Sequence, residues 1–342
     1  MIVAVREALF GDIPALAALE QASPETGPVA IEVRPRVDHF RLAARYPGVR
    51  GYVATAPDGP GIVGMLFASV APTRLDGELV PGAYLFDLRV HPRHRRRGVA
   101  SALIGHAWER ARAEAGVVVA WAAALAGNVA SRRTFRRAGF DQERQLRVRM
   151  VAPGLSAGRP AVGLAYRPAA AKDLPSLAEA LNTHHAGHQL WRPVTGARLA
   201  DELAVLHHAP EDVMLALGPD GGLVGAAGAF DIGRVAHLRL LGLRALPGGA
   251  NWLLARLFRR VPLRPLLVRP ALLPADGATA TAELLRALHR RSPRTPPALA
   301  VTIDPLDPAW PSLARLFGVS AGIHLLARSD RQIDMGQPWH FS

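Results

Sequence analysis

The chain contains one short pattern twice, and this internal repeat limits the folds that it can adopt. The segment Arg6–Ala17 (REALFGDIPALA) matches Arg167–Ala178 (RPAAAKDLPSLA) at an offset of 161 residues. Each copy has an extended start, an aspartate suited to cap a helix, and a helical segment with proline in its first turn. In a chain of 342 residues, long enough for two domains, the repeat predicts two copies of one fold.

A second match follows in the same order and supports the repeat. Ala54–Gly59 (ATAPDG) recurs as Ala216–Gly221 (ALGPDG), and in both places Pro-Asp-Gly lies between apolar runs, which is a hairpin signal. The stretch Pro153–Pro160 is rich in Gly, Pro and Ser and is suited to a linker. The expected division is an N-terminal domain, a linker and a C-terminal domain over 1–152, 153–163 and 164–342.

The first copy reads as an α/β fold of the α+β type, in which helices cover a mixed, partly antiparallel sheet. The expected strands are 2–8, 51–56, 62–71, 84–90, 117–123 and 140–151. The expected helices are 12–21, 37–45, 99–115 and 128–138. The apolar share of 49 % is enough to fill two cores and argues against a disordered chain.

Composition excludes several chemistries. Because the chain has no cysteine, it has no thiolate nucleophile, no disulfide and no cysteine-ligated zinc. The longest apolar stretch, Val117–Ala126, is about half a membrane span and no export signal precedes it. We therefore expect a cytoplasmic protein that does not bind membranes.

The net charge of +13 would attract polyanions, and Lys172 is the only lysine among 41 basic residues. Part of this charge reflects a composition rich in Ala, Arg, Gly and Pro. Aromatic residues make up only 6 %, and no nucleic-acid-binding module is present. We therefore expect no nucleic-acid partner, whereas a phosphate-bearing cofactor fits the charge.

A basic loop and the helix after it carry the strongest signal for a ligand. A β-rich run ends at Val90, and the loop then leads through Gly98 into an Ala/Leu-rich helix. A helix N-terminus presents unpaired N–H groups and the positive end of a dipole, and glycine lets the backbone approach an anion closely. Neighbouring arginines add charged donors. This pattern predicts a phosphate site, and the loop has neither the Walker pattern nor the dinucleotide fingerprint.

Three motifs in this half resemble those of one family. Arg95–Ala100 (RRRGVA) resembles the acyl-CoA-binding pattern Q/R-x-x-G-x-G/A of the GNAT (Gcn5-related) N-acetyltransferases. Asp87–Pro92 (DLRVHP) resembles the end of the family's central strand, and Asn128–Phe140 resembles its N-x-x-A…G-F helix. The resemblance covers about residues 2–150. It implies transfer of an acetyl group from acetyl-CoA to an amine and, with the repeat, two tandem GNAT-like domains.

The resemblance also implies where acetyl-CoA would bind. The backbone of Leu88 and Val90 would pair with the pantetheine arm, and the amides of residues 96–100 would hold the pyrophosphate. Arg132 or Arg133 would meet an adenosine phosphate. The implied cofactor residues are Leu88, Val90, Arg95, Arg96, Arg97, Gly98, Val99, Ala100, Ser101, Asn128, Arg133 and Phe135.

Acyl transfer to an amine requires a base, because an ammonium ion has no lone pair. Asp87 is the best candidate for this base, and Glu78 is the second. The family's frequent acid is a tyrosine at the position of Phe135, which cannot donate a proton; Tyr84 and Tyr52 remain as alternatives. Three further polar residues lie where the family builds its acceptor pocket: Glu32, Asp38 and His39.

The second copy is expected to be degenerate, with two possible alignments. One takes His237–Leu243 as the central strand. The preferred one aligns Val268–Pro270 with residues 90–92 and Gly277 with Gly98, and leaves Asn251–Arg260 as an inserted helix. Both alignments lose the arginine of the cofactor loop, so we expect one acyl-CoA site. The first copy lacks a last strand, which suggests that the copies exchange terminal strands.

Two questions stay open at this point. In the segment with His184, His185 and His188, two histidines lie at i and i+4 and so on one helical face, but no glutamate or cysteine completes a ligand set. We therefore expect core or surface histidines and no metal. The acceptor is either a small-molecule amine or a protein amine, and the sequence does not indicate the oligomeric state. The alternative to an enzyme is a GNAT-like protein that binds acyl-CoA or a partner without turnover.

Overall fold

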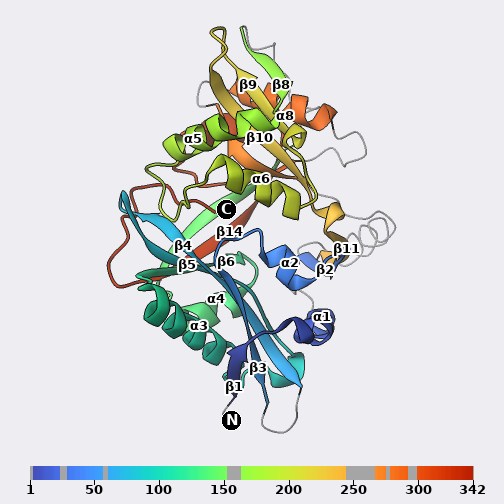
Figure 1. Ribbon diagram of the computed structural model, residues 1–342, viewed down its shortest axis with the longest axis vertical. Coiled ribbons are helices and arrows are strands. Elements are labelled where there is room, and N and C mark those ends of the chain that lie inside the picture. The colour runs from blue at the N-terminus through green and yellow to red at the C-terminus, as the bar shows by residue number, and fades with distance from the viewer. Residues whose placement is uncertain are drawn as a thin grey trace.

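The computed structural model describes residues 3–23, 29–56, 61–151, 163–243, 266–274, 278–291 and 299–341. The two halves of the chain lie at opposite ends of the long axis, and one twelve-stranded sheet runs through both (Figure 1). Nearly all of the expected linker, the expected inserted helix 251–260 and the first Pro-Asp-Gly turn lie outside the described residues. No helix among the described residues has the length and apolar character needed to cross a membrane.

The sheet is mixed, as the sequence predicts. Its strands, in order from one edge to the other, are β1 (Ala4–Glu7), β3 (Val49–Thr55), β4 (Ile62–Leu75), β5 (Glu78–Val90), β6 (Val119–Leu125), β14 (Gly318–Ser329), β7 (Gln142–Val151), β13 (Leu299–Ile303), β12 (Leu266–Leu272), β10 (Leu223–Asp231), β9 (Val213–Leu217) and β8 (Ala165–Pro168). Among the described strands, only β5 with β6 and β12 with β13 pair in parallel, one such pair in each half.

The two halves exchange their terminal strands, which confirms that expectation. The last strand of the chain, β14, lies between β6 and β7, where Ile323 pairs with Leu125 and also with Leu146. β7, from the N-terminal half, pairs in turn with β13 of the C-terminal half. Separating the halves would therefore expose the hydrogen-bonding edges of several long strands.

The two repeated sequence segments make the same side-chain contacts in the structure. In the first copy, Arg6 forms a two-pronged ion pair with Asp12 at 2.7 and 2.8 Å, and Asp12 also accepts from the backbone N–H of Leu9. In the second copy, Arg167 and Asp173 form the same pair at 2.7 and 2.9 Å. A helix with proline in its first turn follows each aspartate: α1 (Ile13–Ala22) and α5 (Leu174–His184).

Helices cover both faces of the sheet in each half. In the N-terminal half, α3 (Val99–Ala115) and α4 (Val129–Arg137) pack on one face, and α1 and α2 (His39–Ala43) pack on the other. In the C-terminal half the corresponding pairs are α8 (Ala278–Arg290) with α9 (Trp310–Ala314), and α5 with α6 (Gly196–Val205). A further core at the junction contains Tyr46, Tyr84, Trp121, Leu190 and Trp339.

A small second sheet also joins the halves. It pairs β2 (Val29–Pro35) with β11 (Ala236–Leu243) in antiparallel fashion. β11 is therefore not the central strand of the second copy, and the first of the two alignments is wrong. The position of the central strand is taken by β12, which lies beside its parallel neighbour β13 as β5 lies beside β6.

The preferred alignment, which pairs Val268 with Val90, is shifted by four residues from the correct one within β12. Each central strand has a bulge: Phe86 pairs just before it in β5, and Val268 pairs just before it in β12. Val268 therefore corresponds to Phe86 and not to Val90. The helix that follows starts at Val99 in one copy and at Ala278 in the other, which agrees with the alignment of residue 277 with Gly98. The loop between the central strand and this helix spans residues 91–98 in the first copy and only residues 273–277 in the second.

Candidate functional site

A V-shaped opening separates β5 from β6. The two strands pair from Gly82 with Val119 to Leu85 with Ala122, and beyond that point they diverge. β5 continues to Val90, so the backbone of Leu88 and Val90 lies along the opening. An extended ligand can add to such an unpaired edge through backbone hydrogen bonds.

The turn before α3 has the geometry of an anion site. Gly98 stands at the N-cap position with a φ of 85°, and no described side chain caps the helix there. Arg96 also has a positive φ of 60°, and the Nε of Arg95 donates to the carbonyl of Val90. Alternating backbone conformations of this kind point successive N–H groups into one concavity. Because a Cβ at Gly98 would meet nothing within 4 Å, the concavity is open to a ligand.

Among the remaining predicted cofactor residues, some side chains are buried and others are exposed. Val99 is buried under the turn, whereas Arg97 and Ser101 are exposed at it. Asn128 caps α4 by accepting from the N–H of Ser131, and Phe135 is buried against Phe140 in the core.

Two arginines of α4 have different surroundings. Arg132 pairs with Glu143 at 2.7 Å, while Arg133 is exposed. Arg133 is therefore the better placed of the two for an adenosine phosphate.

Asp87 lies at the bulge of β5, where the two strands of the V diverge. Its φ is 54°, a left-handed conformation that is uncommon outside glycine and that aspartate and asparagine tolerate best. Its carboxylate lies 3.2 Å from the guanidinium of Arg89 and remains 27 % exposed. Strained backbone conformations of this kind cluster at functional sites.

A cavity of about 240 Å³ opens beside this bulge. Six charged or titratable side chains line it: Glu20, His39, Arg45, Tyr84, Asp87 and Arg89. Glu20, on α1 and only 5 % exposed, lies 3.0 Å from His39 and 3.3 Å from Arg89. The sequence analysis missed Glu20, although a carboxylate next to Leu19 on a buried helical face was a signal that could have found it.

His39 has a shifted pKa in this cavity. Burial lowers the pKa of His39, but the neighbouring Glu20 carboxylate and the charge of Asp87 outweigh it, so that the pKa is raised overall. Arg45 and Arg89 add positive charge to the cavity, and Glu20 and Asp87 add negative charge. His39 lines the same cavity as Asp87, but its raised pKa disfavours it as a base near neutral pH.

Other predicted residues lie away from the bulge. Glu78 begins β5, nine positions and so about 30 Å from Asp87 along the strand, and pairs with Arg331 at 3.0 Å. It is 67 % exposed and does not reach the cavity, so its position does not support a role as base.

Asp38 caps α2 by accepting from the N–H of Arg41, and the side chain of Glu32 is outside the described set.

The alternative acids have unsuitable pKa values. Burial raises the pKa of both Tyr52 and Tyr84 above the ordinary value of a phenol. A phenol that holds its proton so tightly is poorly matched to proton donation near neutral pH.

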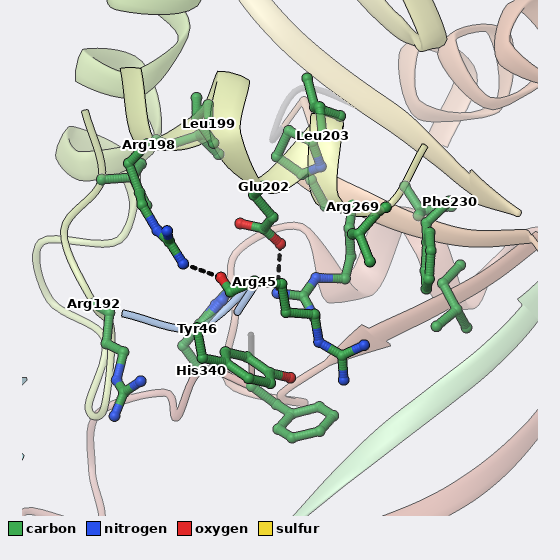
Figure 2. A pocket seen from close by; sticks show the side chains of 18 of the residues that line it. Arg45, Tyr46, Arg192, Arg198, Leu199, Glu202, Leu203, Phe230, Arg269 and His340 are labelled. Carbon is green, nitrogen blue, oxygen red and sulfur yellow. Dashed lines mark hydrogen bonds and ion pairs between the residues drawn. The ribbon is translucent and has the colours of Figure 1, made fainter. Parts of the chain in front are cut away.

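A second pocket, of about 160 Å³, lies between the halves (Figure 2). Among the described residues, Glu202 is the only carboxylate that lines it. Four arginines from separate parts of the chain also line it: Arg45, Arg192, Arg198 and Arg269. Glu202 lies 3.5 Å from Arg269, and Arg198 donates to the carbonyl of Arg45. Arg45 also lines the cavity beside Asp87, so this arginine pocket adjoins that cavity. No motif in the sequence pointed to it.

The arginine pocket has a strongly positive character. Arg192 is buried and burial lowers its pKa to about 10, so it stays charged at neutral pH. The Nε atoms of Arg45 and Arg192 are buried without a hydrogen-bond partner among the described residues. An anion in the pocket would satisfy such donors.

The histidines that were expected to be core or surface residues lie in a cluster with a carboxylate. His184, His185 and His188 gather with Asp307, and their ligand-type atoms lie within 4.8 Å of one another. The sequence analysis missed this set because Asp307 lies more than a hundred residues farther along the chain. His185 and His188 are buried, as core histidines are, and an aspartate, which the sequence analysis did not consider, joins the three histidines.

Residues 16–140 match the sequence model of the acetyltransferase (GNAT) family. No curated protein sequence matches the chain significantly. The fold of the whole chain is similar to that of a GCN5-related N-acetyltransferase from Sphaerobacter thermophilus, with 16 % identity, a TM-score of 0.57 and 98 % of each chain covered.

Two further solved structures share this fold. A tandem GNAT protein from the clavulanic acid biosynthesis pathway has 12 % identity and a TM-score of 0.57, over 97 % of this chain and all of the other. Saccharomyces cerevisiae N-myristoyltransferase with bound myristoyl-CoA has 11 % identity and a TM-score of 0.61, over 96 % of this chain and 79 % of the other. At such identities the likeness shows the fold alone.

The class of protein follows from these observations: a mixed α/β fold that carries the acetyltransferase motifs on a splayed pair of parallel strands. The N-terminal half therefore carries the match to the acetyltransferase (GNAT) family, and the whole chain shares the fold of a tandem GNAT protein. GNAT proteins are acyltransferases that use acyl-CoA. The open turn at Gly98 and the V-shaped opening fit such a donor, because one offers N–H groups to a pyrophosphate and the other offers a strand edge to the pantetheine arm.

Proposed function

We propose that this protein is an N-acetyltransferase that moves an acetyl group from acetyl-CoA to an amine at one site in its N-terminal half. The observation that carries the proposal is the alignment of three features along β5: the turn at Gly98, the divergence after Leu85, and Asp87 at the bulge. Arg95, Arg96, Arg97 and the N-terminus of α3 bind the pyrophosphate in this scheme, and Leu88 and Val90 align the pantetheine arm.

Asp87 is the proposed base. It lines the cavity and keeps an exposed carboxylate, whereas Glu20 is buried between His39 and Arg89. The ammonium form of the acceptor loses a proton to Asp87, directly or through water, and the neutral nitrogen forms a bond to the acyl carbon as the carbon–sulfur bond breaks. The nitrogen then releases a second proton to solvent. The thiolate leaves and takes a proton from solvent, because Phe135 has none to give. A backbone N–H at the bulge stabilises the oxygen that gains charge.

The acceptor that fits best is a small amine bearing a carboxylate or phosphate. The cavity beside Asp87 holds the amine, and the arginine pocket adjoining it through Arg45 holds the anionic group. Pockets that sit between domains and combine apolar walls with a few convergent charges are typical of small-molecule sites. This favours a small molecule over a protein amine.

The C-terminal half is proposed to bind no second acyl-CoA. Its loop between β12 and α8 has lost three positions and contains no arginine. The tail also lies at the opening between β12 and β13, where the N–H of Trp339 donates to Asp304 at 2.9 Å. These features support a structural role for this half and a contribution of arginines to the acceptor pocket.

The test is release of free thiol from acetyl-CoA in the presence of paired amines: amino acids and their uncharged amides. We expect turnover, faster with the acids, and an Arg198→Gln variant that raises KM for the acids more than for the amides. The matched control is Arg137→Gln, on the exposed end of α4. Saturable acetyl-CoA binding without thiol release from any amine would instead support the non-catalytic binding protein.

A further inference from the structure

The histidine–aspartate cluster lies in the C-terminal half, away from the proposed active site. His184 and His185 end α5, and His188 follows three residues later. Asp307 lies in the turn between β13 and α9. The four side chains line a cavity of about 30 Å³ with Val301 and the chain tail, at the opening between β12 and β13.

Asp307 is held so that one oxygen faces the imidazoles. Its Oδ1 accepts from the backbone N–H of Ala309 at 2.8 Å, which fixes the carboxylate. Its Oδ2 lies 2.9 Å from the Nε2 of His188 and 3.9 Å from the Nε2 of His184. The neighbouring Asp304 is occupied elsewhere, because it pairs with Arg144 and accepts from the N–H of Trp339.

His185 is the second observation that points to a ligand. It is only 4 % exposed, and neither of its ring nitrogens has a hydrogen-bond partner among the described residues. A buried polar group without a partner costs about 1–3 kcal/mol, so native proteins rarely leave one. The cavity that His185 lines has room for one water molecule or one ion.

Spacing and ligand chemistry favour an ion over a water. Zinc binds imidazole nitrogen and carboxylate oxygen at about 2.0–2.2 Å, which sets tetrahedral ligands roughly 3.4 Å apart. The separations of 2.9 and 3.9 Å between Asp307 and the two histidines lie on either side of this value. Imidazole with one carboxylate suits zinc and its transition-metal neighbours better than calcium or magnesium.

We propose that His184, His185, His188 and Asp307 bind one divalent transition-metal ion of the zinc type. The ion would tie the end of α5 to the turn before α9 and close the opening between β12 and β13. The corresponding opening in the N-terminal half, between β5 and β6, is the one assigned to the acyl donor. The site is therefore structural, and it stabilises the half that has lost the cofactor loop.

The full-length chain tests this directly. Protein stripped with EDTA is titrated with Zn²⁺ by calorimetry, and with Co²⁺ by visible absorption, which reports tetrahedral coordination. We expect one equivalent of each ion to bind and Zn²⁺ to raise the midpoint of thermal unfolding. Failure of the stripped protein to bind either ion would overturn the proposal.

Two variants and a control make the assignment specific. Asp307→Asn keeps an oxygen for the N–H of Ala309, and His184→Gln alters a partly exposed side chain, so both are expected to fold. Each should weaken Zn²⁺ binding by at least about tenfold. His207→Asn is the control, since His207 is exposed outside the cluster and its φ of 56° suits asparagine. Equal Zn²⁺ affinity in all three variants and the unmodified chain would also overturn the proposal.

Discussion

Arg192 of the C-terminal half donates two hydrogen bonds to Ser69 on β4 of the N-terminal half, at 2.7 Å to the hydroxyl and 2.6 Å to the carbonyl. Its guanidinium also lies over the ring of Trp121, 4.6 Å from the centroid. All three side chains are buried. One cation thus joins the halves at the edge of the arginine pocket.

Arg192→Met is therefore expected to destabilise the whole chain. The change keeps the apolar stem but removes two charge-assisted hydrogen bonds, and it leaves the hydroxyl and carbonyl of Ser69 without these donors. We expect the free energy of unfolding to fall by about 2–3 kcal/mol, measured by urea denaturation. Arg137→Met on the exposed end of α4 should change it by less than about 0.5 kcal/mol. Equal stability of the two variants would contradict this account.

The architecture could be predicted because its signals are local. The Arg6–Asp12 and Arg167–Asp173 segments predicted two copies of one fold, and the basic loop predicted the start of α3 at Val99. The copies could not be aligned correctly through β12, because the loop after it is three residues shorter than the loop after β5, and a single sequence does not mark where residues are missing.

The acceptor side of the site depends on long-range contacts, which a sequence pattern does not specify. Asp87 and His39 were predicted from their positions, but Glu20 joins them only because α1 packs against β4 and β5. The arginine pocket needs the exchanged strands and the β2–β11 ribbon to bring Arg45 near Arg269. Periodicity and spacing do not reveal such contacts.

Asp87→Asn tests the base without disturbing the bulge. Asparagine tolerates a φ of 54° as aspartate does, so the melting temperature should change little. We expect kcat/KM for the amine to fall by about 10²- to 10⁴-fold, while the Kd for acetyl-CoA stays within about twofold. Wild-type turnover rates in the variant would show that another group accepts the proton.

Gly98→Ala tests the turn before α3 and has a matched control. Gly98 and Gly77 have nearly the same φ, 85° and 82°, and a Cβ at either meets nothing within 4 Å. Alanine in this conformation costs about 1–2 kcal/mol in both variants, so both should melt at lower temperature. Only Gly98→Ala should weaken CoA binding, by roughly 5- to 30-fold. In this variant the turn relaxes to accommodate alanine, and it must return to its original conformation before CoA can bind. Equal CoA affinity in the two variants would count against the turn as the pyrophosphate site.

His39 makes stability depend on pH with a defined sign. Because its pKa is raised in the folded chain, its stabilising effect is complete below about pH 6.5 and is lost as the pH rises through the raised value. The groups that face it are Glu20 from α1, with Asp87 and Arg89 from β5. The stability advantage of the unmodified chain over His39→Gln should therefore shrink between pH 6 and pH 9 in thermal melts. An advantage that is constant or grows with pH would refute the assignment.

Binding of CoA to the full-length chain, followed by calorimetry, tests the central claim most directly. The account predicts one equivalent of CoA per chain, with affinity that falls as salt increases and that drops at least about tenfold when Arg95, Arg96 and Arg97 are all replaced by alanine. No binding, two equivalents per chain, or an affinity unchanged by the triple replacement would contradict it.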